Sequence, residues 1–129
     1  MIVNENCIKL ILNKVPEFEL AWQAHLEFWG DEKAGLSNDL SEFASYLVDN
    51  IETLSIDKRQ DIFLFIEICL NEGDESVKDA VASCLLENLL NAVSEGLVDS
   101  KLFVNLLGQE SKKLCKSWDE FTGVKTPGL

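Results

Sequence analysis

The single histidine, His25, is the side chain best suited to proton transfer near neutral pH. A catalytic histidine works beside a nucleophile and an orienting carboxylate. Neither group stands at a diagnostic spacing from His25, which lies between Trp22 and Trp29 in the sequence. We therefore expect a structural histidine packed beside the two tryptophans. An enzyme that uses a dyad of His25 and Cys84, or a pair of carboxylates, is the catalytic alternative.

The four cysteines could bind a metal or form disulfides, but their spacing favours neither. Cys7, Cys69, Cys84 and Cys115 lie far apart, with no CxxC pair and no Cys/His spacing of the zinc type. Each lies in or beside an apolar or helical segment. We expect four unpaired thiols that react slowly, and no metal site.

Carboxylates are abundant: the chain has 23 Asp and Glu residues and only 11 Lys and Arg residues, which gives a formal net charge of −12. In so acidic a chain, no particular carboxylate pair stands out as a general acid and base. There is no glycine-rich phosphate loop, and the acidic segment Asn71–Ser76 lacks the ligand order of a calcium loop. We interpret that segment as a capped turn, and we expect a non-enzymatic protein without a cofactor.

Most of the negative charge lies in one third of the chain. Residues 15–57 contain ten acids and one base, Lys33, for a local charge of −9. Because phosphate binding depends on clustered Lys and Arg, this balance argues against a nucleic-acid partner. The same negative charge attracts a basic protein, which is the class of partner that we expect.

A stripe of acids and one tyrosine follows the segment 37–54. At about 100° per residue, Asp39, Glu42, Tyr46 and Asp49 share one side of a helix, facing away from the apolar residues. An exposed tyrosine among acids is typical of an interface for a basic partner, while a solvated face is the alternative. The residues that we expect to contact the partner are Glu27, Asp31, Glu32, Asp39, Glu42, Tyr46 and Asp49.

The elements that must position these residues are helices. Apolar residues recur at helical spacing along the chain, and Pro and Gly fall mostly between the segments. The segment 57–71 is apolar almost all round, so we expect it near the centre of the core. The predicted helices span residues 4–14, 16–29, 37–54, 57–71, 75–94, 100–107 and 109–121.

These helices predict an all-α fold of one domain over residues 1–129. Its short connections favour an irregular antiparallel bundle or HEAT-like stacked helical pairs, with about six or seven helices. The first residues lack a basic segment followed by a small-residue cleavage site, and no apolar run is long enough to cross a bilayer. We expect a cytoplasmic protein without a membrane anchor, whose oligomeric state the sequence leaves open.

Two stretches, VKDAVASCLLENLLN (Val77–Asn91) and LCKSWDEFTGVKTPGL (Leu114–Leu129), resemble a bacterial family of small acidic helical proteins. That family is catalogued mainly as a domain of unknown function, and its wider setting includes immunity proteins encoded beside polymorphic or contact-dependent toxins. The resemblance supplies no catalytic residues. From the residues themselves, we expect Trp118 and Phe121 to pack the last helix down and Gly123 to allow a chain reversal.

The charge pattern and the resemblance together predict an immunity protein. It would bind a cognate toxin domain, which is basic and in such systems often a nuclease, and cover the toxin's active site. The alternative is a helical scaffold or regulatory adaptor with an unrelated protein partner.

Overall fold

The computed structural model describes all residues, 1–129, and contains seven α-helices and no β-strand. The predicted all-α fold is therefore confirmed. The only strand-like pairing is an isolated bridge between Ile2 and Gly73. The helices are α1 (Asn4–Lys14), α2 (Glu19–Trp29), α3 (Leu36–Asn50), α4 (Ile56–Glu72), α5 (Glu75–Ala80), α6 (Glu87–Ser94) and α7 (Gln109–Thr122).

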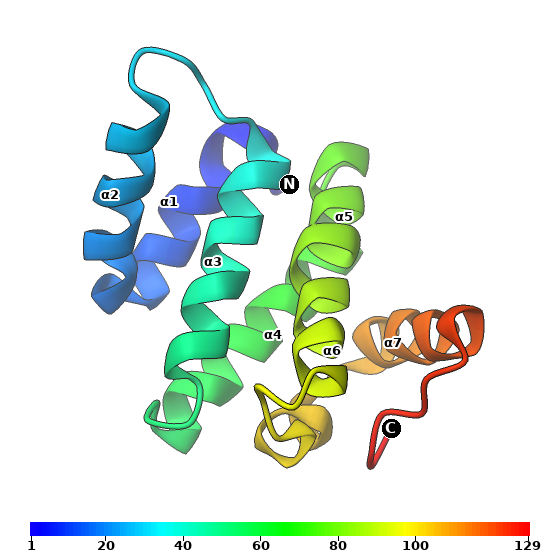
Figure 1. The fold of residues 1–129 in the computed structure, drawn as a ribbon. Coiled ribbons are helices and arrows are strands. Elements are labelled where there is room, and N and C mark those ends of the chain that lie inside the picture. The colour runs from blue at the N-terminus through cyan, green and yellow to red at the C-terminus, as the bar shows by residue number, and fades with distance from the viewer.

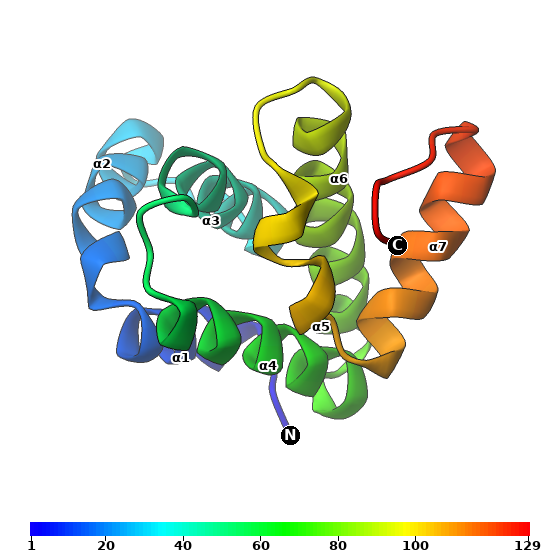
Figure 2. The ribbon, with the colours of Figure 1, turned by 90° about the horizontal axis from the view of Figure 1, so that it is seen from below.

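The helices form two layers (Figures 1 and 2). One layer contains α2 and α3, and the other contains α1 and α4. The continuous rod of α5 and α6 slants across both layers, with α5 beside α4 and α6 beside α3. The chain reverses between α2 and α3, so these neighbours are antiparallel, whereas α3 and the α5–α6 rod run in the same direction because α4 carries the chain back. Helix α2 therefore lies at one edge of its layer, and α7 lies beyond the opposite edge.

Aromatic side chains from several elements meet in the core between the layers. The rings of Phe63 on α4 and Phe103 stack with centroids 5.3 Å apart, and Phe18 meets Phe43 of α3 at 5.0 Å. Helix α4 buries residues on several sides, as its composition predicts, although Leu64 remains exposed. This core holds α3 and α4 together and supplies the surface on which α2 packs.

Several helix boundaries differ from the prediction. Helix α3 begins after Gly35, whose φ of 88° is favourable only for glycine, and not at a Ser37 or Asn38 cap. The segment 100–107 forms two short 3-10 turns in place of the expected helix. The predicted helix 75–94 is one rod, but its middle, Val81–Leu86, is a π-helix.

Side-chain hydrogen bonds cap the start of α5 and fix the C-terminal tail. Asp74 accepts a hydrogen bond from the backbone N–H of Val77 at 2.9 Å, so the acidic segment around it is a capped turn, as predicted. At the far end of the chain, Asp119 accepts hydrogen bonds from the backbone N–H and the hydroxyl of Thr126 at 2.7 and 2.8 Å. Ser100 donates to the carbonyl oxygen of Pro127 at 2.8 Å, so the C-terminal tail is fixed to the body.

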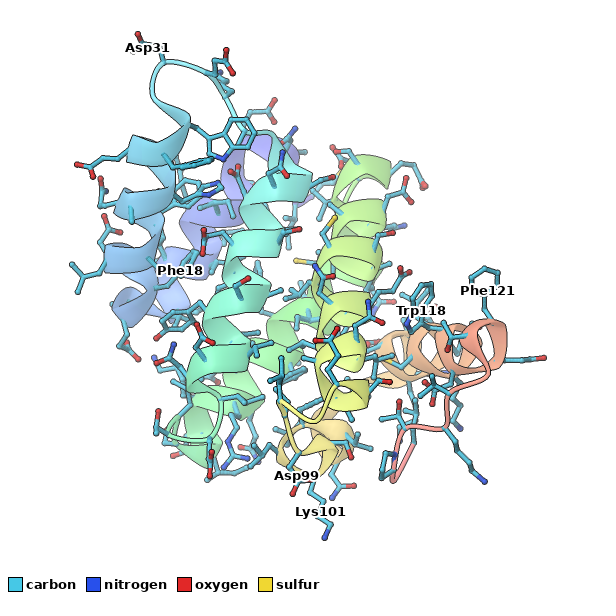
Figure 3. The ribbon with its side chains drawn as sticks, in the orientation of Figure 1. Phe18, Asp31, Asp99, Lys101, Trp118 and Phe121 are labelled. Atoms are coloured by element: carbon cyan, nitrogen blue, oxygen red, sulfur yellow. The ribbon has the colours of Figure 1, made fainter.

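The residues of the C-terminal motif, Leu114–Leu129, have different structural roles. Gly123 has a φ of 77° and reverses the chain after α7, as expected. Trp118 is half-buried and packs against the core, whereas Phe121 is 80% exposed and does not pack the helix down. Both side chains project from the same side of α7 (Figure 3). The tail is locked by Asp119 and Thr126 instead.

Glu67 of α4 caps the first turn of α7. Its carboxylate accepts hydrogen bonds from the backbone N–H groups of Glu110 and Ser111, each at 2.9 Å, and from the Ser111 hydroxyl at 2.8 Å. Burial acts to raise the pKa of Glu67, but these hydrogen bonds outweigh it and leave the pKa below its ordinary value. This cap joins α7 to the two layers.

Candidate partner-binding site

Helix α2 has an inner and an outer face. Phe18, just before the helix, is fully buried, and the half-buried Trp22 and Trp29 continue the inner face along α2. Gly30 ends the helix with a φ of 62°, and the loop 30–35 leads to α3. Since α2 lies at the edge of its layer, no other helix covers its outer face (Figure 1).

His25 lies on the inner face and joins α2 to α3. It is 7% exposed, and its Nε2 atom lies 2.8 Å from a carboxylate oxygen of Asp39. Because an ionised carboxylate can only accept, Nε2 is the donor in this hydrogen bond. The Nδ1 atom faces Glu42 of the same helix at 3.5 Å. Both ring nitrogens therefore point at carboxylates of α3, and the expected structural role of His25 beside the tryptophans agrees with this geometry.

A cleft of about 410 Å³ opens between the end of α2, the loop 30–35 and the first turn of α3. Trp22, His25 and Trp29 are among its lining residues, and the ring centroid of His25 lies 5.4 Å from that of Trp22 and 6.4 Å from that of Trp29. The acids that line it are Glu5, Asp31, Glu32 and Asp39, and the only lysine is Lys33. The cleft is therefore aromatic and acidic.

The outer face of α2 carries exposed apolar side chains that the sequence analysis did not single out. Leu20 and Phe28 are 85% and 83% exposed. Glu27 on the same helix is exposed, and so are Asp31 and Glu32 in the loop. Figure 3 shows Asp31 at the outer end of that loop. We call Leu20, Glu27, Phe28, Asp31 and Glu32 the acidic α2 surface.

The acids of this surface are not neutralised within the chain. None of Glu27, Asp31 and Glu32 takes part in an ion pair. The ion pairs of the structure join Lys58 to Glu17 and Lys113 to Glu110, and His25 contacts Asp39 and Glu42. Their charges are therefore directed at solvent, beside two large apolar side chains. Phe28 directly follows Glu27, and Leu20 lies about two turns earlier in α2. The surface therefore mixes exposed apolar and charged side chains, as a protein interface does.

The remaining predicted contact residues do not share this surface. Asp39 and Glu42 face His25, and Tyr46 is half-buried against Phe18 and Phe43, with ring centroids 5.3 and 6.2 Å away. Burial, with the Glu17 carboxylate nearby, raises the pKa of the Tyr46 phenol. The expected stripe is thus partly covered from Asp39 to Tyr46 by α2 and by Phe18 just before it, and Tyr46 is half-buried instead of the exposed anchor that was expected.

Asp49 lies apart from the others. It lines a separate groove of about 360 Å³ between α3 and α6, together with Ser45 and Asn88. The seven predicted contact residues therefore divide among the acidic α2 surface, the links to His25, the core beside Phe18, and this second groove.

The thiols lie away from the cleft. Cys84, in the π-helix, is half-buried and is not among the residues that line the cleft of His25. Cys7, Cys69 and Cys115 are buried, and all four cysteines are free, as predicted. Burial, with the nearby carboxylates of Asp119 and Glu87, raises the pKa of Cys115 to about 12. No three His, Cys, Asp or Glu side chains lie close enough together to hold a metal ion.

A family model described as a domain of unknown function (DUF7674) matches residues 8–123. The chain belongs to this family. The match includes the acidic α2 surface and all of Val77–Asn91, and it ends at Gly123, before the last residues of the C-terminal motif. No curated protein and no solved structure matches the chain. No helix is both long and apolar enough to pass through a lipid bilayer.

Proposed function

We propose that the chain is a non-enzymatic binding protein whose acidic α2 surface docks onto a basic protein. The observation that carries the proposal is the set of unpaired carboxylates of Glu27, Asp31 and Glu32 beside the exposed Leu20 and Phe28. An acidic helix kept for solubility would not need two large apolar side chains among its charges. Their combination is suited to a partner with basic side chains around an apolar patch.

The two kinds of side chain have different tasks in this interface. The carboxylates steer the partner over distances of about 10 Å or less at physiological salt, and so they raise the rate of association. Leu20 and Phe28 then bury apolar area against the partner, which slows dissociation. Of these two, Phe28 is the better candidate for an anchor, because aromatic residues are enriched at the centres of interfaces.

The partner that we propose is a toxin domain, which the chain neutralises in the cytoplasm as an immunity protein. Many toxins of this setting are nucleases, whose substrate grooves are lined by Lys and Arg. Carboxylates at the end of α2 would occupy the positions of the substrate phosphates, and the body of α2 would block access to the groove. This proposal draws on the resemblance to a family with immunity proteins in its setting and on the acidic α2 surface.

A scaffold or adaptor remains the second candidate function, and the same surface supports it. The two functions differ in what binding does. An immunity protein abolishes the activity of its partner, whereas an adaptor leaves that activity in place and brings a third protein to it.

The test is made with the product of the gene that lies beside this one. Its C-terminal domain is produced in cells from an inducible promoter, with and without this chain, and survival is counted. The immunity function predicts that the domain kills cells and that this chain restores survival. If the neighbouring product is harmless, or kills equally in the presence of the chain, the immunity function is wrong.

Charge-reversal variants test whether the acidic α2 surface is responsible for the survival of the cells. Replacing Glu27, Asp31 and Glu32 together with lysine is expected to abolish protection, while the same three reversals at the exposed Asp61, Asp79 and Glu120 change the net charge equally and serve as the control. The control residues take part in no ion pair. Equal protection by both triple variants would exclude the acidic α2 surface as the binding site.

A further inference from the structure

The cleft beside the acidic α2 surface has a lining that suits a particular kind of side chain. Its volume of about 410 Å³ falls in the range of small-ligand pockets, about 300–1,000 Å³. Trp22, Trp29 and the buried His25 are among its lining residues. Glu5, Asp31 and Glu32 contribute carboxylates that have no ion-pair partner, against one lysine, Lys33. Rings and free carboxylates together favour a cation over an anion or a neutral group.

The shape of the lining distinguishes between the two basic side chains. A guanidinium group is flat, stacks on aromatic faces and binds carboxylates with two parallel hydrogen bonds, whereas an ammonium is a compact and strongly hydrated charge. The rings of Trp22 and His25 lie at 31° to each other, and that of Trp29 lies at 63° to His25. A flat group can therefore stack on one ring while its edge meets another, with carboxylates of the loop at its rim.

The walls of the cleft are held in place before any ligand enters. The hydrogen bond of 2.8 Å from His25 to Asp39 fixes the central ring between α2 and α3. Trp22 packs against Phe18, with ring centroids 6.2 Å apart, and Phe18 itself is fully buried. A wall that is already ordered loses little conformational entropy when a side chain is inserted.

We propose that this cleft receives an arginine side chain of the partner protein, stacked against Trp29 and Trp22 and paired with Asp31 and Glu32. The proposal rests on the proposed function, because the acidic α2 surface brings the partner to the mouth of the cleft. An inserted arginine gives the interface a specific register, which long-range attraction between charges does not provide.

The experiment uses the whole chain and a blocked arginine, N-acetyl-arginine methylamide, as the probe. The three tryptophans, Trp22, Trp29 and Trp118, each give one indole N–H signal in a nitrogen-15 spectrum. Trp118 lies on α7, outside the cleft, and is the internal reference. A single side chain is expected to bind with a Kd of about 1–10 mM, so the titration extends to about 50 mM at constant ionic strength.

Three outcomes decide the proposal. Shifts of the Trp22 and Trp29 signals, with Trp118 unmoved and with no effect of the neutral citrulline analogue, support it. Shifts of equal size from the blocked lysine overturn the selection of a guanidinium and leave only attraction between charges. The absence of shifts, or equal shifts of all three tryptophans, overturns the site.

Two variants test the walls and the rim separately. Trp29→Leu is expected to weaken binding of the blocked arginine about two- to fivefold through the lost cation–π contact. Asp31→Asn with Glu32→Gln changes only exposed side chains, so it folds, and it is expected to weaken binding at least as much. Asp49→Asn with Glu95→Gln, in the other groove, removes the same charge and is expected to have no effect.

The failure of this proposal can be told apart from that of the proposed function. If the blocked arginine does not bind, but reversal of Glu27, Asp31 and Glu32 abolishes protection, the acidic α2 surface is correct and the cleft proposal is wrong. If the blocked arginine binds and the chain neutralises no toxin, the cleft is a guanidinium site and the immunity function is wrong.

Discussion

The Nε2 atom of His25 lies 2.8 Å from a carboxylate oxygen of Asp39, and this hydrogen bond joins the middle of α2 to the first turn of α3. It determines which acids are free to meet a partner. Asp39 is occupied by the histidine, whereas Glu27, Asp31 and Glu32 have no ion-pair partner. Charge reversal at Asp39 would therefore disturb the fold as well as the surface, and it cannot test binding by itself.

The link between α2 and α3 is expected to stabilise the fold. Asp39→Ala leaves the buried imidazole without its acceptor, so we expect a loss of about 1–3 kcal/mol in the free energy of unfolding, measured in urea. Asp49→Ala, on the same helix but exposed and unpaired, is the control and is expected to change stability by no more than about 0.5 kcal/mol. Equal effects of the two variants would contradict the role of the hydrogen bond.

Phe28 is expected to contribute to the affinity for the partner, and Tyr46 to the stability of the fold. Phe28→Ala removes an exposed ring, so stability should change by no more than about 0.5 kcal/mol, while affinity for the partner falls by about 2 kcal/mol, roughly thirtyfold. Tyr46→Ala removes a ring packed on Phe18 and Phe43, and it should lower the unfolding free energy by about 2–4 kcal/mol. Urea unfolding and surface plasmon resonance measure the two effects, and the reverse pattern would contradict the assignment.

The Glu67 cap predicts a dependence of stability on pH. Because the folded pKa of Glu67 lies below its ordinary value of 4.5, the ionised carboxylate contributes stability above about pH 4.5, which is lost as pH falls through the folded pKa. Glu67→Gln should cost about 1–2 kcal/mol at pH 7, and the difference from the parent should shrink below pH 4.5. A difference that stays constant between pH 7 and pH 3 would contradict the cap.

Gly108 gives a second test of the same contact. Its φ of −74° is one that alanine adopts without strain, although alanine is a poorer N-cap residue than glycine. A Cβ at this position, however, would collide with the Glu67 side chain, so Gly108→Ala should destabilise the parent. In the Glu67→Ala background the collision is gone, and Gly108→Ala should cost less stability than it does in the parent. Additive effects in this double-mutant cycle would contradict the close approach.

Periodicity in the sequence predicted the helices and the buried face of α3 well. Leu40, Phe43 and Leu47 are buried as their spacing predicts. Helical spacing says which residues share a face, but not which neighbour covers the rest of the helix. Because His25 of α2 binds Asp39 and Phe18 packs on Tyr46, a stripe expected to face solvent is partly covered.

The candidate site could not be predicted in full, because it depends on contacts between residues that are far apart in the sequence. Asp39 lies 14 residues from His25, and only the reversal at the loop 30–35 brings the two together. The exposed positions of Leu20 and Phe28 could have been noticed, since both fall off the stripe formed by Phe18, Trp22 and Trp29. Their significance depends on α2 lying at the edge of its layer, which follows from the packing of all the helices.

The most direct test of the acidic α2 surface is to measure how the rate of association with the proposed toxin partner depends on ionic strength. For the parent, and for the control with lysine at Asp61, Asp79 and Glu120, the rate should fall steeply between low and physiological salt while dissociation changes little. With lysine at Glu27, Asp31 and Glu32, the rate at low salt should be at least about tenfold lower, and its dependence on salt should largely disappear. If both triple variants lose rate and salt dependence equally, net charge alone attracts the partner, and the acidic α2 surface is not where it binds.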